Sequence, residues 1–392
     1  MCGIVGYVGD RDCADVLVDA LSKLEYRGYD SAGIAVVEKG VIKVEKCKGR
    51  LANLVDKMAV DGKPQGHCGI GHTRWATHGE PSDINSHPHG NKRVSIVHNG
   101  IIENYKQIKD FLIEEGYSFV SETDTETVAK LLDYYYVDDP VDTIIKVLAE
   151  IKGSYALGIM FRDYPDTVFA VRKESPLIVG VGENENFLAS DVPAIIKYTR
   201  DYYLLEANEI AVVKKDSVQI YDMHKEPVHK EINTADWDVD AAEKGGYEHF
   251  MLKEIHEQPA AVRDTVSPRI INGMPDLSQD GVDMQKLKDY RQIFIVACGT
   301  AMHAGMVGKY VIEKLARKPV IVDIASEFRY RDPIITKDDL MIVISQSGET
   351  ADTMAVLRLA KEVGAATLAV VNVVGSSIAR EADMVIYTQC RS

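Results

Sequence analysis

Hydrophobic and polar positions follow two periods in the first 240 residues of the chain. Some segments repeat apolar residues every three to four positions, as helices do, whereas others are short apolar runs typical of strands. The helical pattern covers 14–24, 105–115, 125–136 and 141–151. The strand pattern covers 31–37, 41–46, 93–98, 155–161, 168–171, 177–181, 187–189, 210–213 and 218–221. Because helices and strands come in separate runs, the pattern predicts an α+β domain with largely antiparallel sheets.

The pattern changes after about residue 240. A mixed stretch contains a helical segment at 248–257, which we expect Pro259 to end, and then polar residues. From Arg291 onward strands and helices alternate, with strands over 293–297, 320–324, 340–344, 367–371 and 384–387 and helices over 303–315 and 351–363. This alternation predicts an α/β domain with a parallel sheet. We therefore expect a first domain over 1–240, a connecting segment over 241–285 and a second domain over 286–392.

Composition narrows the possible partners and compartments. A chain of 392 residues is too long for one typical core, and its net charge of -15 argues against a nucleic-acid or anionic-membrane partner. Neither a secretory signal nor an apolar run of membrane-spanning length is present in the sequence. The six cysteines are scattered without a C-x-x-C pair. We expect a cytoplasmic protein with reduced cysteines, no metal and no cofactor.

Cys2 directly follows the initiator methionine. Removal of Met1 would leave a thiol and an α-amine on one residue, and an amine with a pKa near ~8 can serve as the base for its own thiol. Ile4 and Val5 lie between glycines and predict a buried strand that holds this terminus. The alternative is that Cys2 is an ordinary buried cysteine.

Three further stretches supply groups that suit an amino acid with an amide side chain. Arg74 is a natural bidentate partner for a carboxylate, or else part of a surface ion pair. Asn99-Gly100, which we expect just past a strand, offers an amide and a flexible backbone N–H for an oxyanion hole, or else only a turn. Asp124 is an acceptor for a substrate ammonium, or else a helix cap. Histidines 72, 78, 87 and 89 match no familiar zinc spacing, so we expect no metal there.

These stretches fall in five ordered motifs that resemble the N-terminal-nucleophile glutaminase domain of class II amidotransferases. The motifs are Cys2-Gly-Ile-Val-Gly6, Glu25-Tyr-Arg-Gly-Tyr-Asp-Ser-Ala-Gly33, Gly71-His-Thr-Arg-Trp-Ala-Thr-His78, His98-Asn-Gly100 and Ser121-Glu-Thr-Asp124. The resemblance covers about the first 240 residues and implies a four-layer αββα sandwich that acts on L-glutamine.

The same resemblance implies the role of each motif residue. Cys2 would be the nucleophile, its α-amine the base, and Asn99 and Gly100 the oxyanion hole. Arg74 and Asp124 would hold the carboxylate and ammonium of glutamine. The remaining residues would line the site, with Trp75 similar to the residue that gates the ammonia channel: Trp75, Thr77, His78 and His87.

In the second domain, Ser345-Gln-Ser-Gly-Glu-Thr350 joins an apolar strand to a helix. Backbone N–H groups at a helix N-terminus and several hydroxyls suit a dianion, although a serine/threonine helix cap has the same appearance. Cys298-Gly-Thr300 ends another strand of the same expected sheet, where ligand crevices form. Together with Ala325-Ser-Glu-Phe-Arg-Tyr-Arg331, these loops resemble the sugar-isomerase (SIS) domain of the glutamine–fructose-6-phosphate aminotransferase family.

This second resemblance implies that Ser345, Gln346, Ser347 and Thr350 bind the phosphate of fructose 6-phosphate, with Thr300 nearby. It also implies a homo-oligomer formed through the SIS region. Ala301 stands where the family often has serine, so one phosphate hydroxyl would be missing.

The family continues through a second SIS domain, which supplies the lysine, histidine and glutamate that open and isomerise the sugar. We therefore expect a truncated enzyme that retains glutamine hydrolysis, the half-reaction that feeds glucosamine 6-phosphate formation in amino-sugar biosynthesis. Phosphoribosyl-pyrophosphate amidotransferases and asparagine synthetases share the first domain, but the signatures of their acceptor domains do not occur in this sequence. The non-enzymatic alternative is a catalytically silent protein that binds or senses a sugar phosphate.

Overall fold

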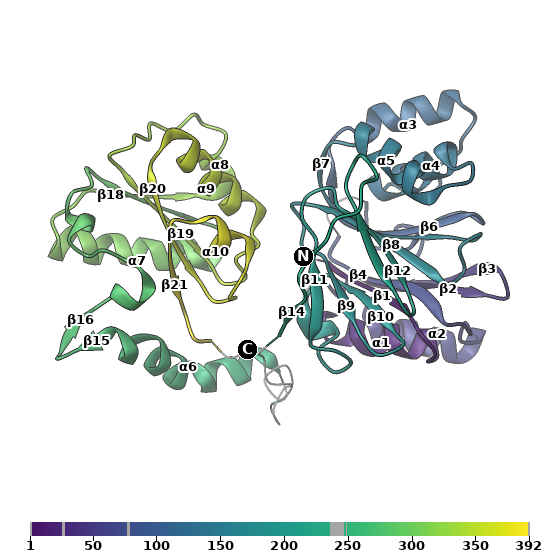
Figure 1. Ribbon diagram of the computed structural model, residues 1–392, viewed down its shortest axis with the longest axis horizontal. Helices are drawn as coiled ribbons and strands as arrows, with labels where there is room; N and C mark the ends of the chain where they lie inside the picture. Colours follow the sequence, from purple (N-terminus) through teal and green to yellow (C-terminus); the bar gives the residue numbers. More distant parts are fainter. Residues whose placement is uncertain (1, 26–27, 77–78, 236–246, 248, 391–392) are drawn as a thin grey trace. The chain divides into compact units, whose positions relative to one another are not determined.

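The computed structural model describes residues 2–25, 28–76, 79–235, 247 and 249–390. Contacts divide the chain into two compact units, Met1–Ala242 and Glu243–Ser392 (Figure 1). The domain boundaries expected near 240 and 285 stay predictions. Within the described ranges, no helix is both long enough and apolar enough to cross a bilayer.

The first unit contains two antiparallel sheets. The first sheet has eight strands in the order β14 (Asn233–Thr234), β11 (Asp201–Leu204), β9 (Ile178–Val181), β10 (Asn186–Ala189), β1 (Gly3–Val8), β4 (Cys68–Arg74), β2 (Ser31–Glu38) and β3 (Val41–Lys48). The second sheet has six strands in the order β13 (Val218–Tyr221), β12 (Ile210–Lys214), β8 (Thr167–Lys173), β7 (Gly153–Phe161), β6 (Val94–Ile102) and β5 (His89–Gly90). β1, which directly follows Cys2, and β4, which ends at Arg74, are neighbours inside the first sheet.

Helices cover the outer faces of both sheets, and the inner faces pack on each other (Figure 1). α1 (Cys13–Ser22) and α2 (Leu51–Asp61) pack on the first sheet, whereas α3 (Tyr105–Glu114), α4 (Asp124–Tyr135) and α5 (Pro140–Glu150) pack on the second. A separate core between the sheets contains Ile4, Ile70 and Val97, one from each of β1, β4 and β6. The unit is therefore a four-layer αββα sandwich, and the α+β prediction is confirmed.

The expected helices and hairpin of this unit are present, and some features differ. α2 and the strands β5, β11 and β14 were not predicted. The apolar stripe of α2 is narrow, since only Leu51, Leu54 and Met58 are buried. The expectation that a strand ends before Asn99-Gly100 is wrong, because β6 runs through both residues. Asn99 and Gly100 pair with Ala156 and Tyr155 of β7. The long ladder with β7 overrides the local turn preference of the Asn-Gly pair.

The second unit is built on five parallel strands, which confirms the predicted α/β parallel sheet. The strand order is β18 (Val320–Ile324), β17 (Ile293–Ala297), β19 (Leu340–Ser345), β20 (Ala366–Val371) and β21 (Met384–Tyr387). The main helices are α6 (Phe250–Val266), α7 (Gly299–Leu315), α8 (Ala325–Phe328), α9 (Ala351–Val363) and α10 (Ser377–Glu381). When the five strands are numbered in chain order, their order in the sheet is 2-1-3-4-5. The connections therefore change direction between β17 and β19, where sheets of this kind bind ligands.

Two features of the second unit differ from the sequence pattern. α6 continues past Pro259 rather than ending there, so the expected break is wrong. A proline removes one hydrogen bond from a helix without preventing the flanking turns from forming. Val282, from the expected connecting segment, is buried in a core with Ile293 and Leu368. The small elements of this unit are η4 (Ser267–Arg269), β15 (Ile270–Ile271), β16 (Met274–Pro275), η5 (Ser278–Asp280) and η6 (Lys286–Lys288), whereas η2 (Val192–Ala194) belongs to the first unit.

Candidate active site

Strand alternation brings the candidate residues to one end of the space between the sheets. Successive side chains of a strand point to opposite faces, so His72 and Arg74 share the inner face of β4 with Ile70. Asn99 likewise shares the inner face of β6 with Val97, whereas His98 points toward the helical layer. Each side chain thus reaches its partners because of its register in a central strand.

Cys2 lies at the start of β1, next to the end of β4. Its Sγ accepts a hydrogen bond from the backbone N–H of Trp75 at 3.2 Å and lies 3.5 Å from the Trp75 carbonyl oxygen. Burial raises the pKa of the Cys2 thiol, and the Trp75 N–H only partly opposes this. The thiol is therefore protonated at neutral pH in this environment, so nucleophilic attack by Cys2 requires a base.

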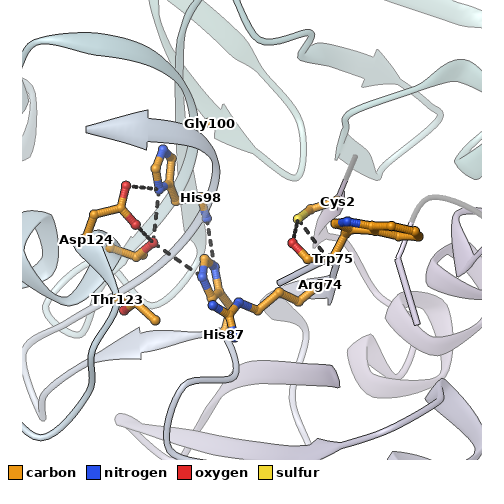
Figure 2. A pocket seen from close by; sticks show the side chains of 9 residues that line it. Cys2, Arg74, Trp75, His87, His98, Gly100, Thr123 and Asp124 are labelled. Carbon is orange, nitrogen blue, oxygen red and sulfur yellow. Dashed lines mark hydrogen bonds and ion pairs between the residues drawn. The ribbon is translucent and has the colours of Figure 1, made fainter. Parts of the chain in front are cut away.

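A recess with an empty volume of about 290 Å³ opens beside Cys2 (Figure 2). Its lining residues are Cys2, Arg74, Trp75, His87, His98, Gly100, Thr123, Asp124 and Thr125. In Figure 2, Cys2 and Trp75 lie on one side and Asp124 and His98 on the other. Of the site residues expected from the sequence, Thr77 and His78 lie outside the described residues.

The recess carries groups of opposite charge. Arg74, at the end of β4, is buried, and its Nη2 donates to the Gly79 carbonyl at 3.3 Å. Asp124 is also buried, and its Oδ2 accepts from the Ile102 N–H at 2.8 Å. Thr123, rather than Asp124, caps α4, because the Thr123 hydroxyl accepts from the Glu126 N–H. A cationic guanidinium and an anionic carboxylate in one recess match the two charges of a free amino acid.

The polypeptide before β2 holds the loop that follows Arg74. The Asp30 carboxylate accepts from the Ala76 N–H at 2.8 Å, and the Asp30 N–H donates to the Arg74 carbonyl at 3.0 Å. A Cβ on Gly28 would lie 2.6 Å from the Arg74 carbonyl carbon, so glycine is required for this approach. The motif around residues 28–33 thus positions the loop against which Cys2 rests.

Asn99 and Gly100 adjoin Cys2 from the second sheet. The Asn99 Nδ2 donates to the Cys2 carbonyl at 3.0 Å. Gly100 has a φ of +127°, and a Cβ there would lie 2.1 Å from the Ser154 carbonyl oxygen of β7. Only glycine fits this position without a shift of the strand pair.

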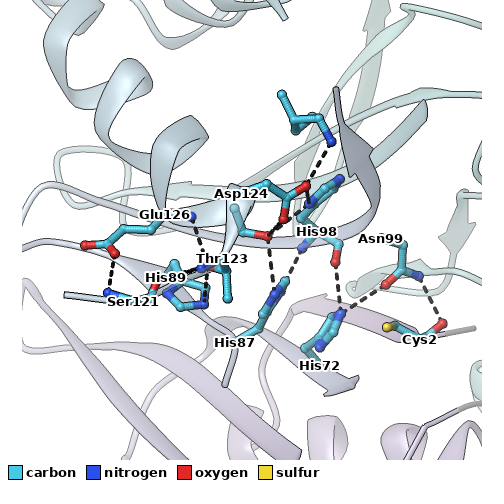
Figure 3. Close-up of polar contacts among 12 residues, drawn as sticks. Cys2, His72, His87, His89, His98, Asn99, Ser121, Thr123, Asp124 and Glu126 are labelled. Atoms are coloured by element: carbon cyan, nitrogen blue, oxygen red, sulfur yellow. Dashed lines mark hydrogen bonds and ion pairs between the residues drawn. The ribbon is translucent and has the colours of Figure 1, made fainter. Parts of the chain in front are cut away.

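Four buried histidines surround these groups in a connected network (Figure 3). His87 Nδ1 accepts from the His98 N–H at 3.3 Å, and its Nε2 lies 3.3 Å from the Thr125 hydroxyl. His72 stacks on His87 with ring centroids 4.1 Å apart. Burial lowers the pKa of His87 and of His89 well below the ordinary value, and that of His72 to about 3. In the part of the chain that the structure describes, no group of three or more His, Cys, Asp or Glu is arranged to hold a metal ion.

Three residues that line the recess were not singled out as site residues from the sequence: His98, Thr123 and Thr125. A signal for two of them was present. Thr123 to Glu126 has the T-x-x-E pattern of a capping box, and the Glu126 carboxylate accepts from the N–H groups of Val120 and Ser121. This cap fixes the start of α4, and with it the positions of Thr123, Asp124 and Thr125.

The second candidate site lies at the carboxyl ends of β17 and β19. The Ser345 hydroxyl accepts from the Gly348 N–H at 3.0 Å and lies 3.0 Å from the Thr350 hydroxyl. Thr350 directly precedes α9, and its side chain makes no capping hydrogen bond. The Ser347 hydroxyl accepts from the Glu349 N–H at 3.2 Å. The hydroxyls of this loop therefore gather at the N-terminus of α9.

Two neighbouring residues complete the second candidate site. Thr300 lies in the first turn of α7, beside the loop because β17 and β19 pair in parallel. The backbone carbonyl of Gln346 accepts from the Asn372 N–H at 3.2 Å. The structure thus brings both sequence-predicted loops to one edge of the sheet.

Comparisons with known proteins agree with this architecture. The family model described as "Glutamine amidotransferase domain" matches residues 72–197, and the one described as "SIS domain" matches residues 286–391. The glutamine–fructose-6-phosphate aminotransferase (isomerizing) of Clostridium acetobutylicum is 59% identical over 391 residues, covering 99% of this chain and 64% of that protein. The protein of the same name from Caldanaerobacter subterraneus is also 59% identical, over 392 residues with the same coverage.

A solved structure supports the fold alone. The glutamine phosphoribosylpyrophosphate amidotransferase of B. subtilis superposes with a TM-score of 0.53 at 16% identity, covering 99% of this chain and 90% of that one. The chain spans 64% of the length of the first curated relatives that it matches. Over both domains, the chain is therefore similar to glutamine–fructose-6-phosphate aminotransferases.

Proposed function

We propose that the first domain hydrolyses L-glutamine to glutamate and ammonia at Cys2. The observation that carries this proposal is the recess in which the Cys2 thiol lies together with a cationic Arg74 and an anionic Asp124. Arg74 binds the α-carboxylate of glutamine and Asp124 its ammonium. The amide side chain then extends toward Cys2, with Trp75 and His87 around the substrate.

Hydrolysis proceeds by acyl transfer. The thiolate of Cys2 attacks the side-chain amide carbon, and the developing oxyanion is held by the Asn99 amide and the Gly100 N–H. After removal of Met1, the α-amine of Cys2 takes the thiol proton and returns a proton to the departing ammonia. Water then cleaves the thioester and releases glutamate. Because burial raises the pKa of Cys2, this base is required for a useful rate at neutral pH.

For the full-length protein, we propose that the ammonia converts fructose 6-phosphate to glucosamine 6-phosphate, which supplies amino-sugar synthesis. The sugar phosphate would bind at the N-terminus of α9 through Ser345, Gln346, Ser347 and Thr350, with Thr300 nearby. Backbone N–H groups and hydroxyls at a helix start favour a dianion without a lysine. We also propose that the SIS region mediates homo-oligomer formation, which sedimentation analysis would test.

Glutamate release from glutamine tests the first proposal, with Cys2→Ala as the matched variant. We expect release by the mature protein and none by Cys2→Ala. Absence of release by the mature protein, even with fructose 6-phosphate present, would refute the glutaminase proposal. Binding of fructose 6-phosphate without any glutamate release would instead favour a silent sugar-phosphate sensor.

A further inference from the structure

His72 is buried beside Cys2 and Asn99 without lining the recess. On β4 it pairs with Ile4 of β1 and Gly33 of β2, and its side chain crosses from the first sheet to the second. Its Nε2 lies 3.0 Å from Asn99 Oδ1 and 3.1 Å from the His98 carbonyl oxygen (Figure 3). The histidine therefore contacts the candidate oxyanion amide from the side away from substrate.

The hydrogen bonds around Asn99 permit one orientation of its amide. The His98 carbonyl can only accept, so the His72 Nε2 beside it must carry a proton and donate. A donor at Nε2 requires the oxygen of Asn99 to face His72. The Asn99 nitrogen then faces the Cys2 carbonyl, which also can only accept, at 3.0 Å. In the flipped amide, oxygen would face oxygen at Cys2, and N–H would face N–H at His72.

The protonation state of His72 supports the same arrangement. Burial lowers its pKa to about 3, so the ring is neutral and carries one proton at working pH. Its Nδ1 is buried and has no hydrogen-bond partner among the described residues. The single proton is therefore best placed on Nε2, where two acceptors share it. The stacked ring of His87 limits rotation of the His72 ring from one face.

We propose that His72 is a positioning residue that fixes the Asn99 amide with its N–H groups toward Cys2, where the oxyanion of glutamine hydrolysis develops. This role rests on the proposed glutaminase activity. The second proton on Asn99 Nδ2 remains available for the oxyanion, since the first is bound by the Cys2 carbonyl. Loss of one oxyanion-hole donor lowers kcat by roughly 10²–10³-fold. Loss of His72 has a smaller effect, because the Cys2 carbonyl still favours the correct amide orientation.

The test compares His72→Phe with His72→Gln. Phenylalanine keeps a flat ring against His87 and removes the donor, whereas glutamine retains an N–H group near the position of Nε2. We expect His72→Phe to lower kcat by roughly 10- to 100-fold with KM for glutamine changed by less than about twofold, because the interaction acts in the transition state. His72→Gln should recover most of kcat. The exposed His229→Phe is the matched control and should behave as wild type.

A double-mutant cycle with Asn99→Ala tests whether His72 affects kcat through Asn99. If His72 acts through Asn99, His72→Phe has little further effect once Asn99 is alanine. Alkylation of Cys2 by iodoacetamide, followed on the N-terminal peptide, forms no oxyanion and should proceed at the wild-type rate in His72→Phe.

Three outcomes would overturn this role: full activity of His72→Phe, additivity with Asn99→Ala, or a parallel loss of alkylation that reveals a general structural defect. Inactivity of the wild-type protein toward glutamine is a different result, since it would refute the proposed function and the role of His72 with it.

Discussion

Gly100→Ala is the substitution whose effect follows most directly from the backbone geometry. The new Cβ would lie 2.1 Å from the Ser154 carbonyl oxygen and 2.7 Å from the Ser154 carbonyl carbon, at a φ of +127°. Both close contacts are with backbone atoms of β7, so no side chain can rotate away. Backbone strain at a positive φ costs roughly 1–3 kcal/mol and overpacking about 1–3 kcal/mol. We therefore expect the free energy of unfolding to fall by roughly 2–6 kcal/mol.

The same shift of β6 should reduce glutamate release, because Asn99 adjoins Gly100. A displacement near 1 Å at a catalytic group lowers the rate by roughly 10²-fold. Gly116→Ala is the matched control: its φ is +92° and a Cβ there meets nothing within 4 Å. Gly116→Ala therefore introduces the same backbone strain without a steric clash. It should keep wild-type activity, and its free energy of unfolding should be about 1–3 kcal/mol higher than that of Gly100→Ala. Thermal unfolding and glutamate release measure both effects. Equal stability and full activity of the two variants would refute this reasoning.

Further predictions concern charge, protonation and the phosphate site. Asp124→Asn and Arg74→Gln should each raise KM for glutamine by roughly 10- to 100-fold, because each removes one charged hydrogen bond to the substrate. An unchanged KM would contradict the assigned roles. Because burial raises the pKa of Cys2, its thiolate forms at higher pH than that of an ordinary cysteine. In protein that retains Met1, the midpoint of Cys2 alkylation against pH should lie above the ordinary thiol value, and a lower midpoint would show that burial does not control this thiol. Ser347→Ala should weaken fructose 6-phosphate binding by roughly 10-fold in calorimetry, whereas unchanged binding would place the phosphate elsewhere.

Much of the site follows from sequence motifs, whereas its network depends on long-range pairing. Cys2, Arg74 and Asp124 are identifiable because each lies in a motif with a chemical role. Asn99 lies beside Cys2, as its motif leads us to expect. It lies inside a strand and not just past one. Asn-Gly is a strong turn signal, which misleads the local prediction. Its place inside β6 depends on pairing with Ala156, far along the chain.

The histidine network could not be predicted from the sequence, because it too depends on long-range strand pairing. Which face His72 and His98 present is decided by strand register, and a one-residue error in the register exchanges the two faces. The roles of His72 and Thr125 therefore emerge only when both sheets are in place. In the second unit, by contrast, the alternation of apolar strands and helices is enough to predict the parallel sheet. Each strand is a short, mostly apolar run in the sequence, even though β18 and β21 are only partly buried.

The central claim is that Cys2, freed of Met1, is the nucleophile that takes the glutamyl group. Mass spectrometry of the N-terminal peptide, after acid quenching during glutamine turnover, tests this most directly. We expect a peptide that begins at Cys2 and carries a γ-glutamyl thioester on its sulfur. Glutamate release by a protein that retains Met1, or with the glutamyl group on another residue, would contradict the account.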